Sequence, residues 1–162
     1  MDTLKFAIKM ENDGEKYYLE QAKLYAGSSL SVVFENLAQD ERNHAEILEN
    51  KLGNRSFNLV DNHTLEGAQN IFKNLKDINS EIRDVPNQLD VYRAALNIEQ
   101  DSIDLYKSFL EKTSDEVEKE LFSFLVKQEE EHYSVLEELI KLVNRPNDWV
   151  ESAEFGIKKE EY

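Results

Sequence analysis

The feature that most constrains the fold of this chain is an internal repeat. Residues 1–52 recur 88 positions later with their chemical character retained. The matched positions include Glu11 and Glu99, Tyr18 and Tyr106, Phe34 and Phe122, Glu41 and Glu129, and His44 and His132. A repeat of this length corresponds to one supersecondary unit, and two copies must pack together to bury the apolar face that neither can bury alone. The chain is therefore predicted to contain two copies of one helical hairpin.

The spacing of apolar residues indicates that each copy is helical. Apolar positions recur at steps of three, four or seven, as they do on one face of a helix. The five Gly and two Pro leave long segments without a break, which favours helices over many short strands. Gly27, Gly53 and Pro146 are expected to end helices, and Thr113 with Glu116 has the spacing of a capping box that starts one. The predicted helices are about 2–26, 29–52, 88–112 and 114–144.

A long connection separates the two hairpins. A structureless segment as long as 53–87 would be unusual in a compact domain. Residues 64–69 and 78–83 have helical patterns, so the connection is predicted to be partly helical and to cross over the bundle. The predicted fold class is all-α, with a four-helix bundle over 1–145 and a C-terminal tail over 146–162.

Composition excludes several classes of function. Lys and Arg total 19 against 34 Asp and Glu, and the resulting formal charge of -15 repels nucleic-acid backbones and anionic membrane surfaces. The absence of cysteine excludes disulfides, thiolate metal sites and thiol catalysis. The first residues contain no continuous apolar segment of the kind found in signal peptides or membrane spans. We therefore expect a cytoplasmic protein that binds neither nucleic acid nor membrane.

Each hairpin carries a Glu-x-x-His motif on its second helix. The motifs are Glu41 with His44, and Glu129 with His132. Residues three apart share one helical face, and this face is otherwise apolar. A single such motif is weak in a glutamate-rich chain, but here both copies also have a Glu thirty residues upstream. The alternative, in which these residues lie on a solvated side of the bundle, would leave a polar gap in the apolar stripe.

Folding of the two hairpins is predicted to gather these side chains at one level. In an antiparallel hairpin, the upstream Glu and the Glu of the motif differ in depth by about 3 Å. Four buried carboxylates repel one another and lose hydration unless cations match them. Carboxylate and imidazole ligands without sulfur suit a pair of iron or manganese ions about 3.5 to 4 Å apart, and zinc would also bind. The predicted ligands are Glu11, Glu41, His44, Glu99, Glu129 and His132, with Glu41 and Glu129 as the bridges.

Two tyrosines lie near the predicted centre. Tyr18 and Tyr106 follow Glu11 and Glu99 by two helical turns on the same face, about 10 Å along the axis. Their hydroxyls either bind ligand carboxylates of the opposite hairpin or are satisfied within an ordinary core. His63, in the connection, is expected to be a surface residue.

At these residues the chain resembles the ferritin-like superfamily, and within it the rubrerythrin branch. The resemblance is carried by MENDGEKYY, DERNHAEIL, IEQDSIDLY and KQEEEHYSVL, and it covers about 1–52 and 88–144. It implies a four-helix bundle that holds a non-haem di-iron centre. It also implies an oxidase or peroxidase that reduces dioxygen or hydrogen peroxide, usually as a homodimer.

Two features depart from the family pattern. Full rubrerythrins carry a cysteine-ligated rubredoxin domain that delivers electrons, whereas this chain has no cysteine, so we expect a separate electron-donor protein. Many members have an additional Glu one turn after the third-helix ligand, at the position of Ser102, and the ligand exchange proposed for their peroxidase turnover uses it. We predict a di-iron oxidoreductase that reduces peroxide or dioxygen. A non-catalytic protein that sequesters iron, or a metal-stabilised interaction module, is the alternative.

Overall fold

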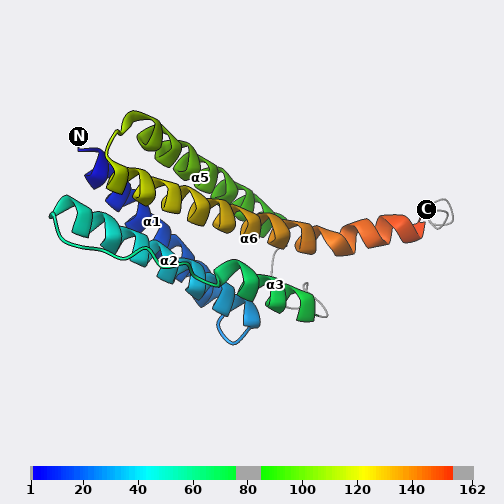
Figure 1. Cartoon of the computed structure of the whole chain (residues 1–162). Helices are drawn as coiled ribbons and strands as arrows, with labels where there is room; N and C mark the ends of the chain where they lie inside the picture. Colours follow the sequence, from blue (N-terminus) through cyan, green and yellow to red (C-terminus); the bar gives the residue numbers. More distant parts are fainter. Residues whose placement is uncertain (1, 76–84, 155–162) are drawn as a thin grey trace.

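The computed structural model describes residues 2–75 and 85–154, with side chains described for 2–75 and 87–144. Two antiparallel hairpins, α1 with α2 and α5 with α6, lie along one another (Figure 1). The all-α class and the two predicted hairpins are therefore confirmed. Within the described residues, no helix is both long enough and apolar enough to cross a membrane. The helices are α1 (Thr3–Leu24), α2 (Ser29–Leu52), α3 (Thr64–Asn74), α5 (Val85–Lys112) and α6 (Glu116–Glu154).

The turn of the first hairpin forms where the sequence predicts a break. Gly27 has φ +88, a left-handed conformation that glycine adopts without the steric cost of a Cβ. The next residue, Ser28, caps α2, and its Oγ accepts a hydrogen bond of 3.0 Å from the backbone N–H of Leu30. At the other end of α2, Gly53 is the C-cap and Asn54 takes the left-handed conformation with φ 55. The predicted end at Gly53 is confirmed, whereas α1 ends at Leu24, before the predicted Gly27, and Gly27 lies in the turn.

The start of α6 differs from the predicted capping box. The helix begins at Glu116, and Asp115 is its cap, because Asp115 Oδ1 accepts hydrogen bonds from the backbone N–H groups of Val117 at 2.8 Å and Glu118 at 3.3 Å. Thr113 lies two residues before this cap, and its Oγ1 donates a hydrogen bond to the Glu118 carboxylate at 2.6 Å. The prediction was wrong because Asp is at least as good an N-cap as Thr and lies next to the helix.

The end of α6 also differs. The prediction places it at 144, before Pro146, but the helix continues to Glu154. A proline removes one backbone hydrogen bond and bends a helix without having to end it, and the next glycine is Gly156. The predicted tail over 146–162 therefore begins within a helix, and 155–162 lie outside the described residues.

The connection between the hairpins contains the first of its two predicted helical pieces. α3 covers the predicted stretch 64–69 and extends to Asn74, and it packs on α2 and α6. The second predicted piece, 78–83, lies outside the described residues. The connection thus places a helix and the segment before it against the second helix of each hairpin.

Two apolar clusters form the core, with a polar layer between them. Along α2, Leu37 belongs to one cluster and Leu48 to the other, and Glu41 and His44 lie between these two leucines. Burial of each leucine or phenylalanine side chain contributes about 1.5 to 3 kcal/mol to the free energy of folding. The two clusters hold the bundle together above and below a layer whose burial is unfavourable by itself.

Candidate metal centre

All six residues predicted as ligands are buried in the polar layer. α1 and α5 each bring one glutamate, whereas α2 and α6 each bring a glutamate and a histidine one turn later. Their exposed fractions are at most 4 %. Charged side chains are almost never this buried unless they are paired or bind a metal. The six are Glu11, Glu41, His44, Glu99, Glu129 and His132.

Their ligand atoms form two groups that share two residues. The first group consists of Glu11, Glu41, His44 and Glu129, and the second of Glu41, Glu99, Glu129 and His132. Within each group, the ligand atoms lie within 4.8 Å of one another. The rings of the two histidines are 5.8 Å apart. This arrangement offers two adjacent groups that could each hold a cation, and the two residues that the groups share are the glutamates predicted as bridges.

The Nδ1 atoms of both histidines face the carboxylates. His44 Nδ1 is 3.2 Å from Glu11 Oε2 and 3.2 Å from Glu129 Oε1. His132 Nδ1 is 3.1 Å from Glu99 Oε2. In each hairpin, the histidine Nδ1 thus contacts the glutamate of the first helix of that hairpin. Both hairpins present the same set of donor atoms to the centre.

A glycine allows α1 to approach this centre closely. Gly14 lies in the middle of α1, where glycine costs about 0.5 to 1 kcal/mol relative to alanine. A Cβ at this position would lie 2.6 Å from Glu41 Oε1. The glycine thus leaves room for a buried carboxylate, and its unusual position within a helix is a signal that the sequence already contains.

Each hairpin also supplies a tyrosine to the glutamate of the other. Tyr18 donates a hydrogen bond to Glu99 Oε2 at 2.7 Å, and Tyr106 donates to Glu11 Oε1 at 2.7 Å. Burial, reinforced by the nearby carboxylates, raises the pKa of both hydroxyls well above 10. The hydroxyls therefore remain protonated and fix the orientation of the two glutamates. Of the two roles considered for these tyrosines, the structure therefore shows hydrogen bonds to glutamates of the opposite hairpin.

Two residues that sequence reasoning missed hold the outer nitrogens of the histidines. His132 Nε2 lies 2.9 Å from Asp40 Oδ2, and His44 Nε2 lies 3.1 Å from Gln128 Oε1. Both acceptors come from the opposite hairpin, and each directly precedes a glutamate of the centre. The repeat itself contains the signal that could have found them, because Asp40 and Gln128 are 88 positions apart.

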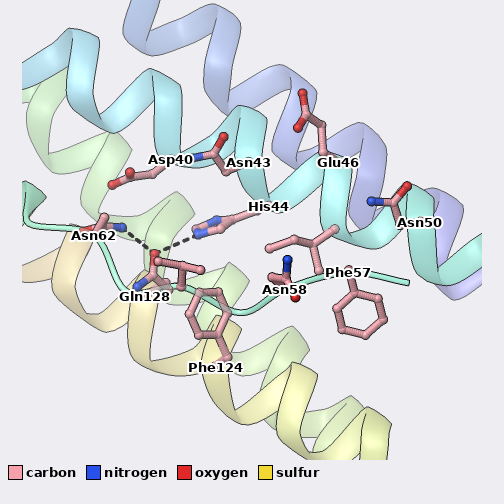
Figure 2. Close-up of a pocket in the computed structure, with 12 residues that line it drawn as sticks. Asp40, Asn43, His44, Glu46, Asn50, Phe57, Asn58, Asn62, Phe124 and Gln128 are labelled. Carbon is pink, nitrogen blue, oxygen red and sulfur yellow. Dashed lines mark hydrogen bonds between the residues drawn. The ribbon is translucent and has the colours of Figure 1, made fainter. Parts of the chain in front are cut away.

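The connection between the hairpins completes this outer layer. Thr64 Oγ1 donates to Asp40 Oδ2 at 2.6 Å, and Asn62 Nδ2 donates to Gln128 Oε1 at 2.5 Å. Figure 2 shows Gln128 between His44 and Asn62, with both hydrogen bonds drawn. The connection therefore fixes the acceptors that orient the two imidazoles.

The electrostatics of the centre favour additional positive charge. Burial, reinforced by the neighbouring carboxylates, raises the pKa of Glu41 and Glu129 well above 4.5. Burial alone would lower the pKa of His44 and His132, but the charges of Glu11 and Glu99 raise both well above 6.5. Without a metal, protons supply the charge that these carboxylates require.

Two buried carboxylate oxygens test whether a metal pair fits these residues. Glu41 Oε2 and Glu129 Oε1 make no hydrogen bond, and both face His44 Nδ1, at 3.5 Å and 3.2 Å. An unsatisfied buried carboxylate oxygen is costly, and coordination of a cation removes the cost. Because these oxygens belong to the two shared glutamates, the donor set fits a pair of metal ions.

The centre has different surroundings on its two sides. On the histidine side, a polar cavity of about 250 Å³ reaches His44 and Gln128 (Figure 2). On the other side, a cavity of about 510 Å³ between α1 and α5 reaches Glu41 and Glu99. Its other lining residues include Phe6, Met10, Tyr17, Tyr18, Ala95 and Ile98.

Two further predicted positions lie where the sequence places them. Ser102 is buried one turn after Glu99, and its Oγ donates to the backbone carbonyl of Ile98 at 3.1 Å. No carboxylate stands at this position. The side chain of His63 is 88 % exposed, so it lies on the surface as expected and does not reach the centre.

A bundle in which two helices give one Glu and two give Glu-x-x-His has the architecture of the ferritin-like carboxylate proteins, which bind pairs of metal ions. The family model for rubrerythrin matches residues 2–140. The chain therefore belongs to the rubrerythrin family, a ferritin-like di-iron family. No curated protein and no solved structure matches it.

Proposed function

We propose that this protein is a di-iron oxidoreductase that reduces hydrogen peroxide or dioxygen with electrons from a separate donor. The observation that carries the proposal is the pair of ligand groups that share Glu41 and Glu129. Each shared glutamate has a buried oxygen without a hydrogen bond. A bound pair of reduced irons would supply two electrons to the oxidant.

Residues of both hairpins would hold this centre, some as ligands and others through hydrogen bonds to the ligands. Glu11 and His44 would bind one ion, and Glu99 and His132 the other. Tyr18 and Tyr106 hold the two terminal glutamates through hydrogen bonds of 2.7 Å each. Because these hydroxyls come from the opposite hairpin, they also tie the hairpins together at the centre.

The cavity between α1 and α5 supports a role in the reduction of small neutral molecules. It reaches Glu41 and Glu99, and its walls are mainly apolar. Apolar walls favour the entry of a small neutral molecule such as dioxygen over that of an ion, and the volume leaves room for peroxide beside the carboxylates. Tyr18 lies at the same wall and stays protonated, and its hydroxyl proton is donated to Glu99.

The electron donor is proposed to be a separate protein because the 162 residues contain no cysteine for an iron–sulfur centre of the rubredoxin type. The homodimer and the cytoplasmic location stay predictions from the sequence and the family resemblance. The alternative function is iron binding without turnover, and Ser102 favours it, because the carboxylate expected for ligand exchange is absent there.

Repeated turnover separates the two functions. The protein is loaded with iron, reduced without oxygen, and mixed with hydrogen peroxide or dioxygen in a stopped-flow instrument in the presence of an artificial electron donor. The proposal expects about two irons per chain, a rapid ferric absorbance change and many cycles per centre. A single oxidation that then stops would support sequestration instead.

A matched pair of variants links any turnover to the centre. Glu41→Gln removes the charge of a shared carboxylate while keeping its shape. Glu46→Gln makes the same change on α2 at a side chain that is 62 % exposed. Turnover should be lost in the first variant and retained in the second. Equal activity in both would assign the reaction to adventitious iron.

A further inference from the structure

We propose that the two metal positions are unequal, and that the position of His132 binds metal more tightly than that of His44. The proposal rests on the di-metal function proposed above. It names Asp40 and Gln128 as positioning residues that act through the histidines. Asp40 and Gln128 are 4 % and 2 % exposed, so water competes little for either contact.

The two imidazoles use their ring nitrogens in the same way, but their Nε2 atoms meet acceptors of different charge. The surroundings of Nδ1 also differ, since Glu129 Oε1 lies 3.2 Å from His44 Nδ1 and 3.8 Å from His132 Nδ1. In both histidines, Nδ1 faces the glutamates and Nε2 faces the opposite hairpin. For His132 the acceptor is the Asp40 carboxylate at 2.9 Å, and for His44 it is the Gln128 amide oxygen at 3.1 Å. An Nε2 that donates to its acceptor leaves Nδ1 as the nitrogen that binds a metal, once the metal has displaced any proton held there.

A charged acceptor strengthens the ligand more than a neutral one does. A hydrogen bond to a carboxylate is roughly twice as strong as one between neutral groups. It withdraws the Nε2 proton and makes the opposite nitrogen a better electron donor, and such outer partners change metal affinity by about 10 to 100-fold. The Asp40 contact should therefore favour the metal position of His132.

The connection between the hairpins preserves this difference. Thr64 donates its hydroxyl proton to Asp40, which stabilises the charged carboxylate. Asn62 Oδ1 accepts a hydrogen bond from the backbone N–H of Thr64 at 3.0 Å, so Asn62 Nδ2 faces Gln128 and calls for the amide oxygen of Gln128 there, which in turn accepts from His44 Nε2. The contacts of residues 62–64 therefore keep the charged acceptor beside His132 and the neutral acceptor beside His44.

The test uses zinc as a redox-inert probe of the metal-free full chain. Calorimetric titration measures the two affinities, and nitrogen NMR of the histidine rings reports which ring changes first. The wild type should bind two zinc ions with affinities about 10-fold or more apart. The ring signals of His132 should change before those of His44.

Two isosteric variants should change the difference in opposite directions. Asp40→Asn should weaken the tighter site by about 10-fold or more, and Gln128→Glu should strengthen the weaker one by a similar factor. Controls make the same charge changes at exposed positions beside the centre, with Asp61→Asn for the first and Asn43→Asp for the second. If Asp40→Asn fails to fold, Gln128→Glu still tests the proposal.

Three outcomes would overturn the proposal, and they are distinguishable. Two equal zinc affinities in the wild type, or filling of the His44 position first, would contradict the inequality alone. Affinity changes as large in the control variants as in the isosteric ones would assign the effect to net charge. A protein that binds no zinc would contradict the metal centre itself, and the proposed function with it.

Discussion

The two hairpins give the same ligands to the centre, but they differ in what surrounds those ligands. Gly14 of the first hairpin corresponds to Ser102 of the second, 88 positions later. Gly14 leaves room for the Glu41 carboxylate, whereas Ser102 binds its own helix and lies 3.4 Å from Met10 Sδ. The residues that repeat thus set the ligand symmetry, and the residues that do not repeat make the two halves unequal.

The same contrast holds for the outer layer and for access. Asp40 in one half is replaced by Gln128 in the other, and of the two histidines of the centre it is His44 that lines the polar cavity. A duplicated hairpin therefore provides a symmetric metal site within an asymmetric protein. Four changes, taken from the largest expected effect to the smallest, test how far this difference extends.

Removal of either histidine should abolish one metal position. His44→Ala and His132→Ala should each lower the iron content from about two per chain to about one, because each ion loses its single nitrogen ligand. Iron content is measured by mass spectrometry on protein loaded without oxygen. A His44→Ala protein that still binds two irons would contradict the ligand assignment.

Removal of metal should make stability fall as pH rises. The pKa values of Glu41, Glu129, His44 and His132 are raised in the folded metal-free protein, so above pH 4.5 the folded state binds more protons than the unfolded state. Stability from these groups is then lost toward higher pH. The pKa of Glu11 is lowered, so its contribution to stability is lost only as the pH falls below 4.5.

Metal should reverse this dependence, because it displaces the same protons and binds better as pH rises. Urea unfolding between about pH 5 and 9, with and without metal, measures both effects. The difference in unfolding free energy between the loaded and the metal-free protein should increase with pH. A difference that is constant or decreases would contradict the pKa directions in the centre.

Loss of either tyrosine hydroxyl should destabilise the protein to a similar extent. Tyr18→Phe and Tyr106→Phe each remove one buried hydrogen bond to a carboxylate, and such bonds contribute about 1.5 to 3 kcal/mol. Urea unfolding of the metal-loaded proteins measures the loss. Equal losses would indicate that the two tyrosines hold Glu99 and Glu11 equally well. A loss of stability in only one variant would show that the two hairpins differ in these bonds too.

The smallest expected effect on stability concerns the non-repeating pair Gly14 and Ser102. Gly14→Ala should cost about 1 kcal/mol of stability and should also weaken iron binding, because the new Cβ displaces the Glu41 carboxylate. Ser102→Ala should leave iron binding unchanged, since it removes a hydroxyl that contacts the Ile98 carbonyl and Met10 Sδ but none of the proposed ligands. Weaker binding in both variants, or in neither, would contradict the proposed role of Gly14.

The ligand set could be predicted because helix periodicity and the repeat specify it together. Glu41 and His44 share a face by spacing alone, and Glu129 and His132 repeat that spacing. Antiparallel hairpins then bring the upstream glutamates to the same level. The spacing placed Tyr18 and Tyr106 near the centre but left open whether they bind ligand carboxylates or pack in an ordinary core, and the structure decides for the carboxylates.

The outer layer could not be predicted in the same way. The repeat pairs Asp40 with Gln128, but no helical spacing shows that Asp40 contacts His132 across the bundle, at a sequence separation of 92. Asn62 and Thr64 lie in an irregular segment whose path depends on packing against both hairpins. The end of α6 was mispredicted for a different reason, because one proline interrupts a helical hydrogen-bond pattern without ending it.

The central claim is that six buried residues bind two metal ions. Crystals of the iron-loaded protein, measured with X-rays on both sides of the iron absorption edge, test it directly. The account predicts two anomalous peaks in each chain, one beside Glu11 and His44 and the other beside Glu99 and His132, with Glu41 and Glu129 between them. A single peak, or none within the bundle, would contradict it.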